Sequence, residues 1–73
     1  MRYTVVLRPD PETPGSWLAE VPAIPWCATF GRSPEEALAH AKDALAAALE
    51  AMEALGEVPP PDVRVAEVVL DAA

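Results

Sequence analysis

Residues 31–36, with the sequence Gly-Arg-Ser-Pro-Glu-Glu, decide the fold of this chain. Ser33 is suited to the N-cap of a helix, because its hydroxyl can accept a hydrogen bond from a free amide of the first turn. Pro34 fits the first helical position, where its missing N–H costs nothing, and Glu36 completes a capping box. The stretch therefore predicts that a helix begins at Pro34 and that the residues before it form a separate segment.

The predicted helix runs from Pro34 to Leu55, and Gly56 supplies the left-handed position that commonly follows a helix. Nine of its 22 residues are alanine, which favours the helix and lets a second surface approach closely. Its apolar side chains recur every three or four residues and form one stripe: Leu38, Ala41, Leu45, Ala48, Leu49, Met52 and Leu55.

Three strands are predicted before this helix. Arg2–Arg8 alternates apolar and polar residues, and Ser16–Val21 repeats the pattern after a connection rich in proline over residues 9–15. Pro22–Pro25 is expected to be a rigid extended connector, because each proline fixes its own φ and restricts the preceding residue. A short third strand is expected at Cys27–Phe30.

A fourth strand is predicted after the helix, at Val63–Leu70, following three consecutive prolines. Its Val68–Leu70 run is apolar on both faces, which is expected if one face meets the core and the other a subunit or partner. The order β-β-β-α-β predicts an α+β two-layer sandwich. It would have one mostly antiparallel sheet, one long helix on one face, and the fourth strand parallel to the first. Residues 1–73 are expected to form a single domain.

The composition limits the classes of function. The chain has 73 residues and a formal net charge of −7, which opposes binding to a phosphate backbone and suits a basic protein partner. A core this small offsets little more than the conformational entropy of folding, so we expect a homo-dimer or higher oligomer. One cysteine excludes an intrachain disulfide, and neither a targeting segment nor an apolar stretch long enough to span a bilayer is recognised. We expect a cytoplasmic protein.

The residues that carry chemistry do not assemble into a catalytic set. Cys27 and His40 are the only thiol and the only imidazole, and no orienting third group accompanies them. We expect Cys27 to be a structural thiol and His40 to be a solvated side chain between Glu36 and Asp43. No metal site is predicted, because a second imidazole or thiolate ligand is lacking. No enzymatic activity is predicted, because no set of nucleophile, base and orienting group can be named, and no cofactor is predicted either.

Trp26 is the residue most suited to a partner contact. It lies between Pro25 and Cys27 in the expected connector, and aromatic side chains dominate the binding energy of protein interfaces. Ile24 in the same connector and Val69 in the apolar C-terminal run are the other predicted contacts.

Taken together, the chain resembles the HicB-like antitoxin family over almost its whole length. The resemblance is carried by a hairpin, a proline-cysteine-glycine block and a capped helix start: Tyr3, Asp10, Gly15-Ser16-Trp17, Val21-Pro22, Ile24-Pro25, Cys27, Thr29, Gly31, Ser33–Ala37, Ala41, Gly56 and Pro59-Pro60. It departs from the usual family pattern at Ala23, Trp26 and Arg32, all close to the connector.

The resemblance implies a partial ribonuclease-H-like fold without ribonuclease-H catalysis, which binds and neutralises a small basic HicA-like RNA-cleaving toxin. Longer family members carry a C-terminal DNA-binding domain; we expect none within these 73 residues, so the resemblance does not imply operator binding by them. An alternative remains open: a stand-alone homo-oligomeric scaffold without a toxin partner, which binds a small ligand between subunits.

Overall fold

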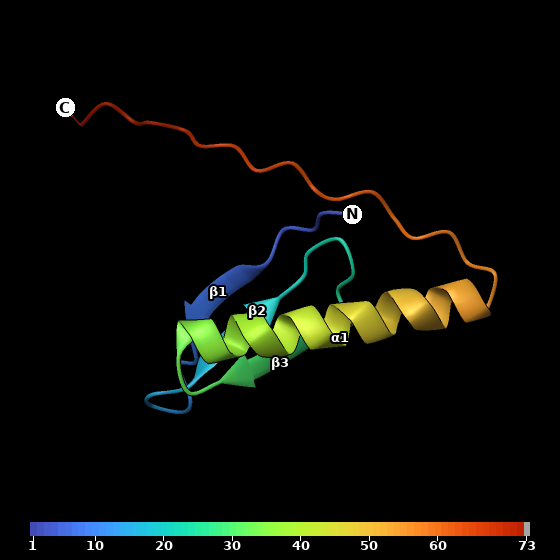
Figure 1. Cartoon of the computed structure of the whole chain (residues 1–73). Helices are drawn as coiled ribbons and strands as arrows, with labels where there is room; N and C mark the ends of the chain where they lie inside the picture. The colour runs from blue at the N-terminus through green and yellow to red at the C-terminus, as the bar shows by residue number, and fades with distance from the viewer. Residues whose placement is uncertain (73) are drawn as a thin grey trace.

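The computed structural model describes residues 1–72 and has two layers, a three-stranded sheet and one helix (Figure 1). The strands are β1 (Val6–Pro9), β2 (Trp17–Glu20) and β3 (Ala28–Gly31), and the helix α1 spans Pro34–Ala54. The sheet order is β1-β2-β3 with both pairs antiparallel. The α+β class predicted from the sequence is confirmed, in a β-β-β-α order.

The start of α1 is built as the sequence predicts. The Ser33 backbone is extended, and its hydroxyl accepts a 3.0 Å hydrogen bond from the Glu36 amide. The Glu36 carboxylate reaches back to the Arg32 amide, one residue earlier than in a standard capping box. Gly31 lies against this turn so closely that a Cβ atom on it would be 2.5 Å from the Ala37 nitrogen.

The end of α1 is a Schellman motif. Gly56 has a φ of 72°, and its amide donates to the Glu53 carbonyl at 3.1 Å. The Glu57 amide donates to the Met52 carbonyl at 2.8 Å, so the last carbonyls of the helix are satisfied.

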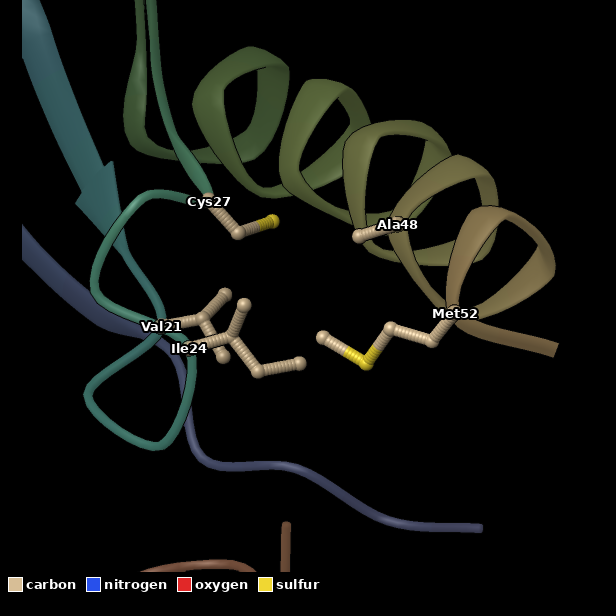
Figure 2. Packing of buried hydrophobic residues seen from close by; sticks show 5 residues of the cluster. All are labelled: Val21, Ile24, Cys27, Ala48 and Met52. Carbon is tan, nitrogen blue, oxygen red and sulfur yellow. The ribbon is translucent and has the colours of Figure 1, made fainter. Parts of the chain in front are cut away.

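The core consists of two adjoining clusters between α1 and the sheet side of the chain. In the first, Val21, Ile24 and Cys27 face Ala48 and Met52 of the helix (Figure 2). The second is formed only by alanines, Ala19 of β2 with Ala37 and Ala41 of α1. Because alanine has no side chain beyond Cβ, the helix approaches the sheet closely at this end.

The apolar stripe of α1 is rotated relative to the prediction. Ala37 is fully buried, whereas Leu38, which the spacing placed in the stripe, is 46% exposed. Leu55, at the other end of the predicted stripe, is also exposed. The alanine contact with β2 sets this rotation and leaves Leu38 at the margin of the sheet.

The predicted fourth strand is absent from the described residues. The chain beyond Gly56 carries no strand, and in Figure 1 it runs from the end of α1 past the N-terminus and then away from the sheet. Its hydrogen bonds with the N-terminal segment are made at Tyr3 and Thr4, before β1 begins at Val6, so the segment pairs with no strand there. Among residues 1–72, no helix is long and apolar enough to cross a membrane.

Candidate protein-binding surface

Two exposed aromatic rings lie close together in the sequence, around β3. Trp26 and Phe30 are each 65% exposed, and Ala28 between them is exposed as well. Cys27, in the alternate position, is buried. This period of two means that the segment turns one face into the core and presents its aromatic face to solvent.

Trp26 is presented by a loop with a fixed backbone. Three backbone hydrogen bonds hold it: the Ile24 amide donates to the Val21 carbonyl, the Cys27 amide donates to the Ile24 carbonyl, and the Val21 amide closes the loop by donating to the Cys27 carbonyl. The side chains of Val21 and Ile24 are both only 1% exposed and point toward Met52 (Figure 2). The buried side chains of Val21 and Ile24 therefore anchor the loop to the hydrophobic core.

Ile24 consequently does not belong to the surface at which the sequence analysis placed it. The connector folds back on itself instead of remaining extended, which turns Ile24 inward and leaves Trp26 outside. Val69 is 88% exposed, but it belongs to the C-terminal segment that leaves the sheet. Of the three predicted contact residues, only Trp26 lies on the aromatic surface.

Phe30 extends this surface onto the sheet face that α1 leaves uncovered. Its cross-strand neighbour is the half-buried Leu18, and Leu18 is paired in turn with Arg8 on β1. Arg8 forms an exposed 2.7 Å ion pair with Glu20 across the same face. We call Trp26, Phe30 and Leu18 the aromatic surface. Phe30 was missed from the sequence, because alternation along the strand does not tell which of its two faces α1 covers.

His40 is exposed, as expected from the sequence, and its ring is bound to the backbone of β3. Its Nδ1 lies 2.7 Å from the Phe30 carbonyl, and because a carbonyl only accepts, Nδ1 carries the proton and donates. This hydrogen bond connects the first half of α1 to the outer edge of β3. No cluster of three potential metal ligands occurs among residues 1–72.

Cys27 has the environment of a structural thiol. It is 5% exposed beside Ile24 and Ala48, and burial raises the pKa of its thiol. Because the thiolate is the reactive form, a raised pKa makes Cys27 a poor nucleophile at neutral pH.

The acidic residues are concentrated on the exposed side of the helix. Five of them are exposed there: Glu35, Glu36, Asp43, Glu50 and Glu53. Lys42 is the one lysine or arginine of α1. The aromatic surface is thus carried by a domain of net charge −7 whose helix has a negative outer side. This combination fits a basic macromolecule better than an anionic ligand.

Comparison with known proteins gives one informative relative. No protein-family model matches the chain, and no solved structure matches it. The UPF0150 protein Ta0767 of Thermoplasma acidophilum is 37% identical over 62 residues, which cover 85% of this chain and 87% of that protein. Identity at this level over nearly the full length of both chains shows that the protein belongs to the UPF0150 family.

Proposed function

We propose that this protein is an antitoxin-type inhibitor that binds a small, basic, HicA-like RNA-cleaving toxin through the aromatic surface. The observation that carries the proposal is the pair of exposed rings, Trp26 and Phe30, on a segment with a fixed backbone. Membership of the UPF0150 family and the resemblance to HicB-like antitoxins along the chain support it.

The geometry suits an interface hot spot. Large aromatic side chains release much water-exposed apolar area when a partner covers them, and they lose little conformational entropy. The loop that carries Trp26 is held by backbone hydrogen bonds and by the buried Ile24 side chain. Binding therefore orders few residues, and more of the contact free energy appears as affinity.

The charge distribution suits the proposed partner. A ribonuclease that binds RNA needs a cationic surface, and a domain of net charge −7 attracts such a surface over long range. The same charge repels RNA and DNA, so inhibition would come from covering the toxin and not from binding its substrate. We propose no catalytic step and no cofactor for this chain.

The test first asks whether an adjacent reading frame encodes a small basic protein, and then titrates that protein with this chain. RNA cleavage should fall to zero near a 1:1 ratio of the two chains, and the antitoxin alone should cleave no RNA. Trp26→Ala should weaken the complex, and Leu55→Ala, which also removes a large exposed apolar side chain, is the matched control. Equal effects of the two variants would remove the aromatic surface from the proposal. Failure to bind or inhibit such a protein would favour the stand-alone scaffold.

A further inference from the structure

An apolar groove lies along the margin of the sheet, where α1 extends past β1. It encloses about 490 Å³, and its apolar lining comes from Tyr3, Val5, Leu38, Ala39 and Leu45. The helix lies mainly over β3 and β2, so the β1 side of the sheet is the less covered one. The exposed Leu38 and the half-buried Val5 are therefore side chains that an additional strand beyond β1 would cover.

The outer edge of β1 has the polar groups that such a strand requires. The Asp10 amide donates to the Ser16 carbonyl, and alternation along the hairpin then directs the backbone groups of Leu7 away from β2. The opposite edge of the sheet is different, because His40 already occupies the Phe30 carbonyl there. The β3 edge is therefore obstructed at Phe30, whereas the β1 edge offers the Leu7 amide and carbonyl to a further strand.

The same chain carries an unpartnered segment of strand-like sequence. We call residues 63–70, Val-Arg-Val-Ala-Glu-Val-Val-Leu, the C-terminal arm. Its valines at 65, 68 and 69 and its Leu70 are all between 74% and 88% exposed. With Val63, which is 38% exposed, five large apolar side chains lie in eight residues, too many for a segment that stays in water.

The start of the arm is fixed, and its direction leads away from the sheet. The Asp62 carboxylate accepts hydrogen bonds from the Thr4 amide at 2.9 and 3.0 Å and from the Thr4 hydroxyl at 2.8 Å. The Tyr3 hydroxyl donates to the Pro60 carbonyl. Beyond these contacts the arm diverges from β1 and projects past the body of the molecule (Figure 1).

The dimensions of the chain indicate how much surface lacks a partner. A compact monomer of this mass is expected to expose about 4,300 Å² and to have a radius of gyration of about 11 Å. This chain exposes 5830 Å² and has a radius of gyration of 14.6 Å. The excess of about 1,500 Å² is comparable to what one subunit contributes to an obligate dimer interface.

We propose that the C-terminal arm of each chain adds as a fourth strand to the β1 edge of a second copy, with its apolar side chains in the groove beside Leu38. Each copy has one arm and one groove, so a reciprocal exchange about a two-fold axis uses both and leaves neither free. An eight-residue strand spans about 26 Å, which is more than the four residues of β1 need. The β-β-β-α-β order expected from the sequence is then completed between chains.

The first test measures the oligomeric state of the full chain by sedimentation. The wild type is expected to be a dimer at micromolar concentration, and Val69→Asp should raise the dimer dissociation constant at least about tenfold. Val58→Asp is the matched control, since Val58 is 89% and Val69 88% exposed, and Val58 lies outside the arm. A monomeric wild type overturns the proposal, as does an equal response of the two variants.

The second test identifies where the arm lies. A photo-reactive benzoylphenylalanine at position 65 should produce a species of twice the chain mass, and its cross-linked peptides should come from residues 3–9 or 35–45. Cross-links to those same peptides at single-chain mass would show that the arm folds onto its own sheet and would overturn the exchange. Cross-links to the aromatic surface would show that the arm does not bind in the groove, and would overturn the proposal. Neither test uses a toxin, so these results are independent of the proposed function.

Discussion

The Asp62 carboxylate accepts three hydrogen bonds from Thr4, which lies 58 positions earlier in the chain: two from the Thr4 amide and one from the Thr4 hydroxyl. This contact is what brings the segment after α1 back beside the first strand. It holds the chain next to Thr4 directly before the C-terminal arm begins at Val63.

The Asp62–Thr4 contact should make the position of the C-terminal segment depend on pH. The hydrogen bond from the Thr4 amide, and to a smaller extent that from the Thr4 hydroxyl, lowers the pKa of the Asp62 carboxyl below its usual value. A lowered folded-state pKa stabilises the attached segment above the unfolded pKa of about 3.9, and that stabilisation is lost as pH falls through the folded pKa. NMR titration should show the Asp62 carboxyl and the Thr4 amide changing together below pH 3.9. Asp62→Asn should remove the pH dependence of the Thr4 signal, and an unchanged Thr4 titration would contradict the contact.

Removal of the helix cap should lower the stability of the fold. In Ser33→Ala the Glu36 amide loses the hydroxyl that accepts its hydrogen bond, and this change is expected to cost about 1 kcal/mol of unfolding free energy. Ser16→Ala, at a serine outside the helix start, serves as the control. Chemical denaturation monitored by circular dichroism measures both variants. Equal midpoints for Ser33→Ala and the wild type would show that the hydroxyl does not stabilise the helix.

Gly31 should tolerate no side chain. A Cβ atom there would lie 2.5 Å from the Ala37 nitrogen and 2.9 Å from its Cα, and both are backbone atoms that cannot rotate away. Gly31→Ala is therefore expected to destabilise the protein by about 1–3 kcal/mol through overpacking, although alanine favours strands more than glycine does. The exposed Glu50→Ala is the control for a substitution that adds no contact. A stabilised Gly31→Ala would mean that α1 can move away from β3.

The elements that could be predicted from the sequence are those that neighbouring residues determine. Ser33 and Glu36 define the helix start within one turn, and the alternation around β1 and β2 defines a hairpin whose two strands are adjacent in the chain. The fourth strand could not be predicted in the same way, because its pairing is not local. The strand propensity of Val63–Leu70 is visible in the sequence, but propensity does not say which edge accepts the strand.

The aromatic surface was only partly predictable for a related reason. Trp26 and Ile24 have the same proline-rich context in the sequence, and only the folded loop turns one outward and the other into contact with Met52. Phe30 looked like any other apolar strand residue, since which strand face is covered depends on where α1 packs. The hydrogen bond from His40 to the Phe30 carbonyl also depends on that packing.

Salt and the Trp26 ring should act on different steps of binding to a basic toxin. The attraction between a chain of net charge −7 and a cationic partner operates before contact, and salt at 0.1 M screens it beyond about 10 Å. Rising salt should therefore lower the association rate constant and leave dissociation nearly unchanged. Trp26→Ala should do the reverse, because the ring contributes only after it is covered, with a loss of about 2 kcal/mol in affinity. Surface plasmon resonance across a salt series measures both rates for the wild type, Trp26→Ala and the Leu55→Ala control. If Trp26→Ala slowed association and left dissociation unchanged, the ring would not be a buried anchor, and the contact with the toxin would have to lie elsewhere on the chain.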